Sequence, residues 1–162
     1  MQQRKPNRIP SYDYSQNGAY FITLCTQDRK QILSNIVGDG FPVPTVYGKV
    51  AEEFIRIIPT KYPAVSVDKY VIMPDHIHIL LRIDVTTDGT GNPSPTLGTI
   101  MGWYKYQVTK TINNTKHTSG EQLFQRSYYD HVIRNQQDYD EVWEYIESNP
   151  RKRAMMKRSR SP

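Results

Sequence analysis

Two histidines separated by a single residue, His76 and His78, are the residues whose types and spacing most favour chemistry in this chain. Residues 69–82 around them are rich in β-branched and apolar types that alternate, which predicts strand structure. Pro74 divides the segment, because proline cannot donate a hydrogen bond to a sheet. Alternate strand residues share a face, so both imidazoles should project together, roughly 7 Å apart. Such a pair can hold one metal ion, and simple polar packing is the alternative.

Tyr145 and Asn149 form the second candidate group, four residues apart in a predicted helix over residues 136–155. Both fall on one flank of the apolar stripe of that helix. A tyrosine on the edge of a stripe, with a carboxamide one turn later, suits a half-exposed reactive role, and an ordinary boundary tyrosine is the alternative. The stripe recurs with helical spacing and consists of Tyr139, Val142, Trp143 and Ile146.

The elements that must position these residues follow from pattern and turn signals. Their order, β-α-β-β-α-β-α, predicts an α+β protein, a ferredoxin-like β-α-β-β-α-β sandwich with an antiparallel sheet and helices on one face. The last helix is added to this core and carries Tyr145, so we expect it on the free face, beside the histidines. Strands are expected at 19–26 and on both sides of Pro74, and a fourth strand or an irregular edge at 123–134. Helices are expected from Thr45 to about Tyr62 and from Thr96 to about Asn114, and loops at 34–44 and 84–95.

Basic charge is concentrated near the carboxyl end of the sequence. The formal net charge is +5, but residues 151–162 hold six basic residues and no acidic one, which leaves 15 basic and 16 acidic residues elsewhere. We expect one domain over residues 1–155 and a basic tail over residues 156–162. Such a tail is either solvated or follows nucleic-acid phosphates. The 12 tyrosines and 2 tryptophans offer stacking surfaces for unpaired bases.

Other features of the sequence favour a cytoplasmic location. A single cysteine, Cys25, excludes an internal disulfide framework and agrees with a reducing compartment. The polar start of the chain is unlike a signal peptide, and no run of eighteen apolar residues occurs. We therefore expect no membrane partner.

Three blocks of the sequence resemble one known family in their order and spacing. Residues 70–79 contain Met-Pro before the histidine pair, residues 124–134 form a second block, and residues 138–150 contain the pattern Tyr-Ile-x-x-Asn-Pro. Together these blocks resemble the REP-associated tyrosine transposases, which belong to the single-tyrosine transposases of the HUH endonuclease superfamily. The resemblance covers nearly the whole chain.

The resemblance implies a sequence- and structure-specific enzyme that cuts and rejoins single-stranded DNA at hairpin-forming repeats. Tyr145 would attack a phosphodiester and form a 5′-phosphotyrosine link. His76, His78 and Asn149 would hold a divalent metal ion, and an incomplete protein shell of this kind suits Mg²⁺ or Mn²⁺. Many members of the wider group carry glutamine where this chain has the shorter Asn149.

Single-stranded or hairpin DNA is the partner that the resemblance implies, and several charged residues are candidate contacts. We expect a monomer whose helix completes its own site, with a homodimer that exchanges helices as the alternative. The candidate DNA contacts are Lys105, Arg126, His131, Arg134, Arg151, Lys152 and Arg153.

Two other functions fit part of the pattern. A DNA-hairpin-binding protein could keep the fold without cutting, and burial of Tyr145 away from the histidines would favour it. A histidine-triad nucleotide hydrolase also begins with two alternate histidines on a strand. That family needs a third histidine two residues later, where this chain has Leu80.

Overall fold

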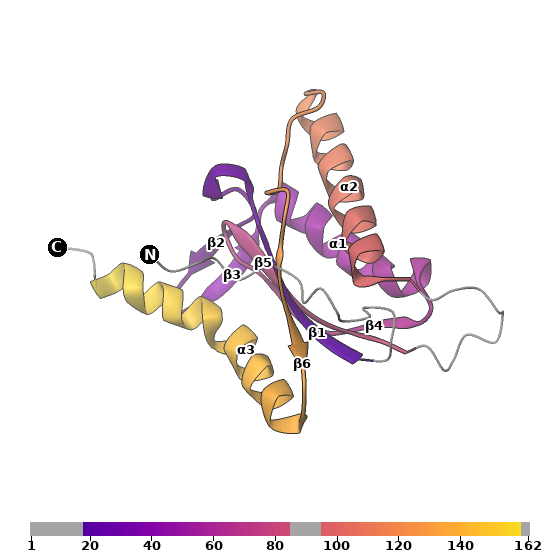
Figure 1. The fold of residues 1–162 in the computed structure, drawn as a ribbon. Helices are drawn as coiled ribbons and strands as arrows, with labels where there is room; N and C mark the ends of the chain where they lie inside the picture. Colours follow the sequence, from indigo (N-terminus) through magenta and orange to yellow (C-terminus); the bar gives the residue numbers. More distant parts are fainter. Residues whose placement is uncertain (1–17, 85–94, 160–162) are drawn as a thin grey trace, which may run out of the picture.

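The computed structural model describes residues 18–84 and 95–159, and their side chains as far as Met155. Its centre is a four-stranded antiparallel sheet in the order β4-β5-β1-β6 (Figure 1). Strand β5 lies between β1 and β4, and β1 lies between β5 and β6, which is the ferredoxin-like arrangement of two split β-α-β units. The predicted fold class is therefore confirmed. The strands are β1 (Gly18–Cys25), β4 (Val65–Ile72), β5 (His76–Ile83) and β6 (Tyr129–Ile133).

Helices α1 (Val46–Lys61) and α2 (Leu97–Lys116) enclose the larger of two hydrophobic cores with one face of the sheet. Both helices begin where the sequence predicts, because the hydroxyl of Thr45 accepts from the Gly48 amide and that of Thr96 from the Thr99 amide. Alternation along β5 supplies the sheet side of this core through Ile77, Ile79, Leu81 and Ile83.

Helix α3 (Gln136–Ser159) covers the opposite face of the sheet, where a second core lies (Figure 1). Val142 and Ile146 of the predicted stripe pack there against Phe21 and Leu80 from the sheet. The stripe is thus confirmed, and the tyrosine helix lies on the face that the histidines share. The helix continues past its predicted end at Met155, so the tail expected from residue 156 begins as helix.

The prediction of a loop over residues 34–44 is wrong, because the segment forms a hairpin of β2 (Ser34–Val37) and β3 (Phe41–Pro44). Its glycines, Gly38 and Gly40, both have positive φ and make the turn. The prolines at 42 and 44 are tolerated because each strand of this two-stranded sheet has a free edge. Glycine and proline therefore mark the turn and edges of a hairpin here.

The strand predicted within residues 123–134 is shorter than expected. Only β6 pairs with the sheet, and before it Phe124 makes one isolated bridge to Thr26. Most of the predicted loop at 84–95 lies outside the described residues. Among the helices that are described, none is long and apolar enough to cross a membrane.

Candidate active site at the histidine pair

His76 and His78 project from β5 towards α3, as the alternation of the strand predicts. Their ring centroids are 4.6 Å apart. His78 lies opposite Thr23 of β1 in the sheet register, and His76 lies opposite Cys25. Both residues are buried, with 8% and 4% of their surfaces exposed. The pair therefore forms a close, largely dry group at the end of the second core.

One nitrogen of each imidazole is engaged by a neighbouring side chain. Nδ1 of His78 lies 2.9 Å from the hydroxyl of Thr23, and Nδ1 of His76 lies 2.8 Å from a carboxylate oxygen of Asp75. These contacts leave the Nε2 atoms for a ligand, which is how metal-binding histidines are usually oriented. The carboxamide nitrogen of Asn149 is 3.4 Å from Nε2 of His78, and a half-turn of that amide would place its oxygen there.

Burial favours the neutral form of both imidazoles by lowering their pKa values. It lowers the pKa of His78 to about 3, with smaller contributions from His76 and Arg29. Burial also lowers the pKa of His76, although the adjacent carboxylate of Asp75 acts in the opposite direction. Neutral imidazole is the form that binds metal ions.

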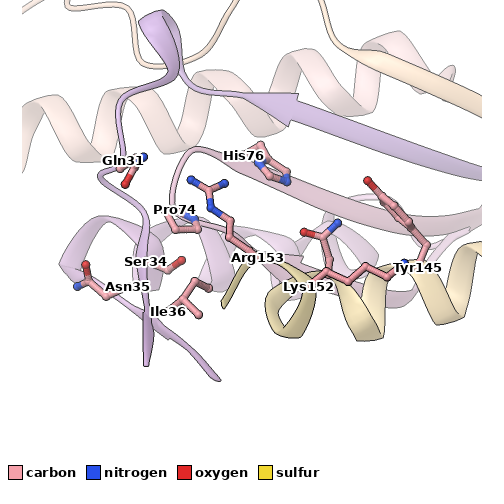
Figure 2. A pocket seen from close by; sticks show the side chains of 10 residues that line it. Gln31, Ser34, Asn35, Ile36, Pro74, His76, Tyr145, Lys152 and Arg153 are labelled. Atoms are coloured by element: carbon pink, nitrogen blue, oxygen red, sulfur yellow. The ribbon is translucent and has the colours of Figure 1, made fainter. Parts of the chain in front are cut away.

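Tyr145 reaches the same group from α3. Its ring centroid is 5.3 Å from that of His78 and 5.9 Å from that of Phe21, which it meets edge-on. Figure 2 shows the side chain extending from the helix towards the strand that carries His76. With 44% of its surface exposed, Tyr145 is half-exposed, as its place on the flank of the stripe predicts. The structure thus brings Tyr145, both histidines and Asn149 together.

Asp75 is a residue of the site that the sequence pattern does not predict. Besides His76, its buried carboxylate accepts from Arg153 of α3 at 2.7 Å and from Arg29 at 3.2 Å. Burial alone would raise the pKa of Asp75, but the bonds to Arg153 and His76 outweigh it and lower the pKa to about 2. Its place directly before the first histidine was the only sequence signal.

Two cavities meet at His76 and Tyr145. One has a volume of about 580 Å³ and lies between the β2–β3 hairpin and α3 (Figure 2). The other has a volume of about 600 Å³ and extends past His78 to Tyr129 and His131 on β6. A linear polymer bound at the histidines can therefore continue into either cavity.

The comparisons with known proteins agree with this arrangement. The family model for IS200-like transposases matches residues 14–149, which include His76, His78, Tyr145 and Asn149. The chain belongs to this transposase family.

Individual relatives have low sequence identity to this chain. A Haemophilus influenzae protein without an assigned function is 29% identical over 91% of this chain and 88% of its own. A second protein from that organism, assigned as a REP-associated tyrosine transposase, is 26% identical over 85% of this chain and 73% of its own. A solved REP-associated tyrosine transposase bound to a REP hairpin has the same fold, with a TM-score of 0.58 and 19% identity over 94% of this chain and 74% of that one.

The candidate DNA contacts of the transposase divide into two groups by position. His131 lines the cavity at β6 and lies 2.8 Å from a carboxylate oxygen of Asp138. Exposed Arg134 follows β6 directly. On α3, Arg151 and Lys152 are exposed, and Arg153 is half-buried against Asp75; the nitrogen of Lys152 is 5.8 Å from the ring centroid of Tyr145.

Lys105 and Arg126 belong to a different part of the surface. The ammonium group of Lys105 donates to the carbonyl oxygens of Gln125 and Arg126, so it holds the segment before β6 against α2. Both residues line a separate cavity beside α2 that includes none of the histidine-site residues. The structure therefore does not bring them to the site.

The residues present fit a divalent ion in this transposase. Two neutral imidazoles with engaged Nδ1 atoms and one adjacent carboxamide supply three donors and leave positions for water or phosphate oxygens. No cluster of three or more histidine, cysteine, aspartate or glutamate side chains suited to a metal occurs in the described parts of the chain. The third donor would have to be Asn149.

Leu80, where a histidine-triad hydrolase needs its nucleophile, is fully buried in the second core.

Proposed function

We propose that this transposase cuts and rejoins single-stranded DNA beside hairpin-forming repeats, through a covalent 5′-phosphotyrosine intermediate. The single observation that supports this most is the half-exposed ring of Tyr145 in contact with buried His78, whose ring in turn meets that of His76. A tyrosine whose only role was packing would lie within the apolar stripe. Tyr145 lies beside the stripe and faces a pair of potential metal ligands.

The reaction is a transfer of one phosphodiester bond. The oxygen of Tyr145 attacks the phosphorus atom, a bond from that oxygen to phosphorus forms, and the bond from phosphorus to the 3′ oxygen breaks. The phenol loses its proton, and the departing 3′ oxygen gains one. The reverse reaction with the 3′ hydroxyl of another end restores a phosphodiester, so no external energy source is needed.

His76, His78 and Asn149 would hold Mg²⁺ or Mn²⁺, which when bound polarises a non-bridging phosphate oxygen. Asp75 and Thr23 orient the two imidazoles for that purpose. Phe21 and His78 support the ring of Tyr145 from the sheet and limit where its hydroxyl can point. The protein thus contributes orientation and charge, which dominate catalysis of phosphoryl transfer.

A DNA hairpin with single-stranded flanks is the proposed substrate. A solved protein with the same fold is bound to a REP hairpin, and this chain belongs to a transposase family. Both support the assignment. We propose that a single chain suffices, since α3 completes the site on its own sheet.

Replacement of Tyr145 by phenylalanine tests the function. Tyr145→Phe keeps the ring contacts, so folding and DNA binding should persist, whereas covalent attachment and cleavage of a labelled hairpin substrate should disappear on a denaturing gel. Tyr129→Phe, which alters another half-exposed tyrosine beside the same histidines, is the matched control and should still cut. Full cleavage by the Tyr145 variant would assign the nucleophile to another residue.

The metal is tested with the natural chain in the same assay. Cleavage should stop in excess chelator and return with Mg²⁺ or Mn²⁺, and His76→Ala or His78→Ala should reduce the rate at least about 100-fold. Undiminished cutting in chelator would end the metal proposal. Binding of the hairpin without any cleavage by the natural chain would instead favour a protein that holds DNA and does not cut it.

A further inference from the structure

The proposed bond transfer uses only the inner end of the cavity between the β2–β3 hairpin and α3. Tyr145, His76 and Asn149 form its inner end, where the reaction is proposed to occur. Figure 2 shows Gln31 and Ile36 on one side of the remaining space and Lys152 and Tyr145 on the other. Its volume of about 580 Å³ is within the range of sites that hold small ligands.

Charge favours this cavity over its neighbour as the path of a DNA strand. Its lining contains two basic residues, Lys152 and Arg153, and no acidic one. Arg153 is paired with Asp75, so Lys152 supplies the charge that a phosphate would meet. The cavity on the β6 side is lined by two acidic residues, Asp138 and Glu141, and by one basic residue, Arg29, which is paired with Asp75. The first cavity is therefore the more favourable environment for a polyanion.

The walls of the cavity suit an unpaired base. Ile36 and Pro74 provide apolar surface for the faces of a ring. The side-chain amide of Gln31 lines the rim and has no hydrogen-bond partner among the residues that the structure describes. An amide offers both a donor and an acceptor, and proteins read unpaired bases through such bonds to the base edges.

We infer that this cavity holds the unpaired base of the nucleotide adjoining the scissile phosphate. Gln31 bonds to the edge of that base, and Lys152 lies beside its phosphate. The inference rests on the proposed DNA cleavage and adds to it a subsite that places the strand. It also assigns a binding role to the β2–β3 hairpin of the protein, through Ile36.

The location of the base is measured in a Tyr145→Phe background, so that no cutting is needed. The isotope-labelled protein is titrated with hexathymidylate and with the same strand carrying abasic sugars at all six positions. The methyl signals of Ile36 and the side-chain amide of Gln31 should shift with hexathymidylate and much less with the abasic strand. Shifts confined to Tyr129 and His131 on the other side, or equal shifts with both strands, would overturn the inference.

The role of the amide is measured by affinity. Gln31→Leu should weaken binding of hexathymidylate about three- to tenfold, the usual value of one or two hydrogen bonds, and should leave binding of the abasic strand unchanged. Gln107→Leu makes the same change on α2, on the other face of the sheet, and serves as the matched control. Equal losses for both strands would contradict a bond to the base.

These measurements separate the subsite from the proposed function. Hexathymidylate that binds without any shift at Gln31 and Ile36 would refute the subsite and leave the cleavage proposal intact. Absence of binding by any single strand would refute both. A natural chain that binds the base at Gln31 but never cuts would retain the subsite and refute the cleavage.

Discussion

The carboxylate of Asp75 accepts hydrogen bonds from three separate parts of the chain: His76 on β5, Arg29 after β1 and Arg153 on α3. One side chain thus orients a proposed metal ligand and also attaches the helix that carries Tyr145. Because the group is buried, each bond is worth more than it would be at the surface. Asp75 is therefore a positioning residue, since its contacts act through other side chains.

Replacement of Asp75 by asparagine is expected to weaken metal binding. The amide keeps the shape of the side chain but loses the charge that fixes His76, and loss of such a partner typically lowers metal affinity 10- to 100-fold. Titration of the free protein with Mn²⁺, followed by electron paramagnetic resonance, measures this without DNA. Asp68→Asn is the control, because Asp68 also joins α3 to the sheet, through Tyr139, but does not contact the histidines. Equal Mn²⁺ affinity in the two variants would argue against the role.

At the scale of elements, the position of α3 depends on its contact with the β2–β3 hairpin as well as on the sheet. A Cβ atom on Gly40, whose φ is +125°, would lie 2.5 Å from the Cα of Arg151. The turn between β2 and β3 therefore approaches the helix backbone as closely as a glycine permits. This contact lies two residues beyond Asn149, so it also fixes one end of the candidate site.

Gly40→Ala should therefore destabilise the protein more than a comparable change next to it. Backbone strain and overlap with α3 together should lower the free energy of unfolding by at least about 2 kcal/mol. Gly38→Ala is the control, because it also has positive φ but meets nothing within 4 Å, and strain alone should cost about 1–2 kcal/mol. Urea denaturation of both variants measures the difference. Equal losses would mean that the hairpin can move away from the helix.

The elements that the sequence predicts correctly are those with strong local periodicity. Alternation placed His76 and His78 on one face of β5, and helical spacing placed Tyr145 and Asn149 on one flank of α3. The hairpin was missed because glycine and proline signal turns locally, whereas pairing of β2 with β3 depends on the partner strand. Lys105 and Arg126 are predicted DNA contacts, and the fold shows that they lie beside α2, away from the histidine pair.

At the scale of the whole molecule, the basic tail at residues 156–162 is a further source of positive charge for DNA binding. Deletion of residues 157–162 removes Lys157, Arg158 and Arg160. If all three follow phosphates, the slope of log affinity against log salt for a single strand should fall in magnitude by up to roughly 2, at about 0.7 per contact. Fluorescence anisotropy at several salt concentrations measures the slope, and the position of cleavage should not change.

A charge-matched variant provides the comparison for that deletion. Conversion of Lys49, Lys61 and Lys110 to glutamine removes the same charge from exposed positions on α1 and α2, away from the histidine face. It should leave the slope nearly unchanged. An unaltered slope in the truncated chain would mean that the tail is merely solvated.

The place of α3 in the sequence, after every strand of the sheet, also sets an order of events during translation. The codon for His76 is read about 70 codons before that for Tyr145. At 5–20 residues per second, a ribosome makes the histidine strand roughly 4–14 s before it adds the nucleophile. Any product that stops between these points lacks Tyr145, the proposed nucleophile. If Tyr145 is the nucleophile, such partly made chains do not cut DNA.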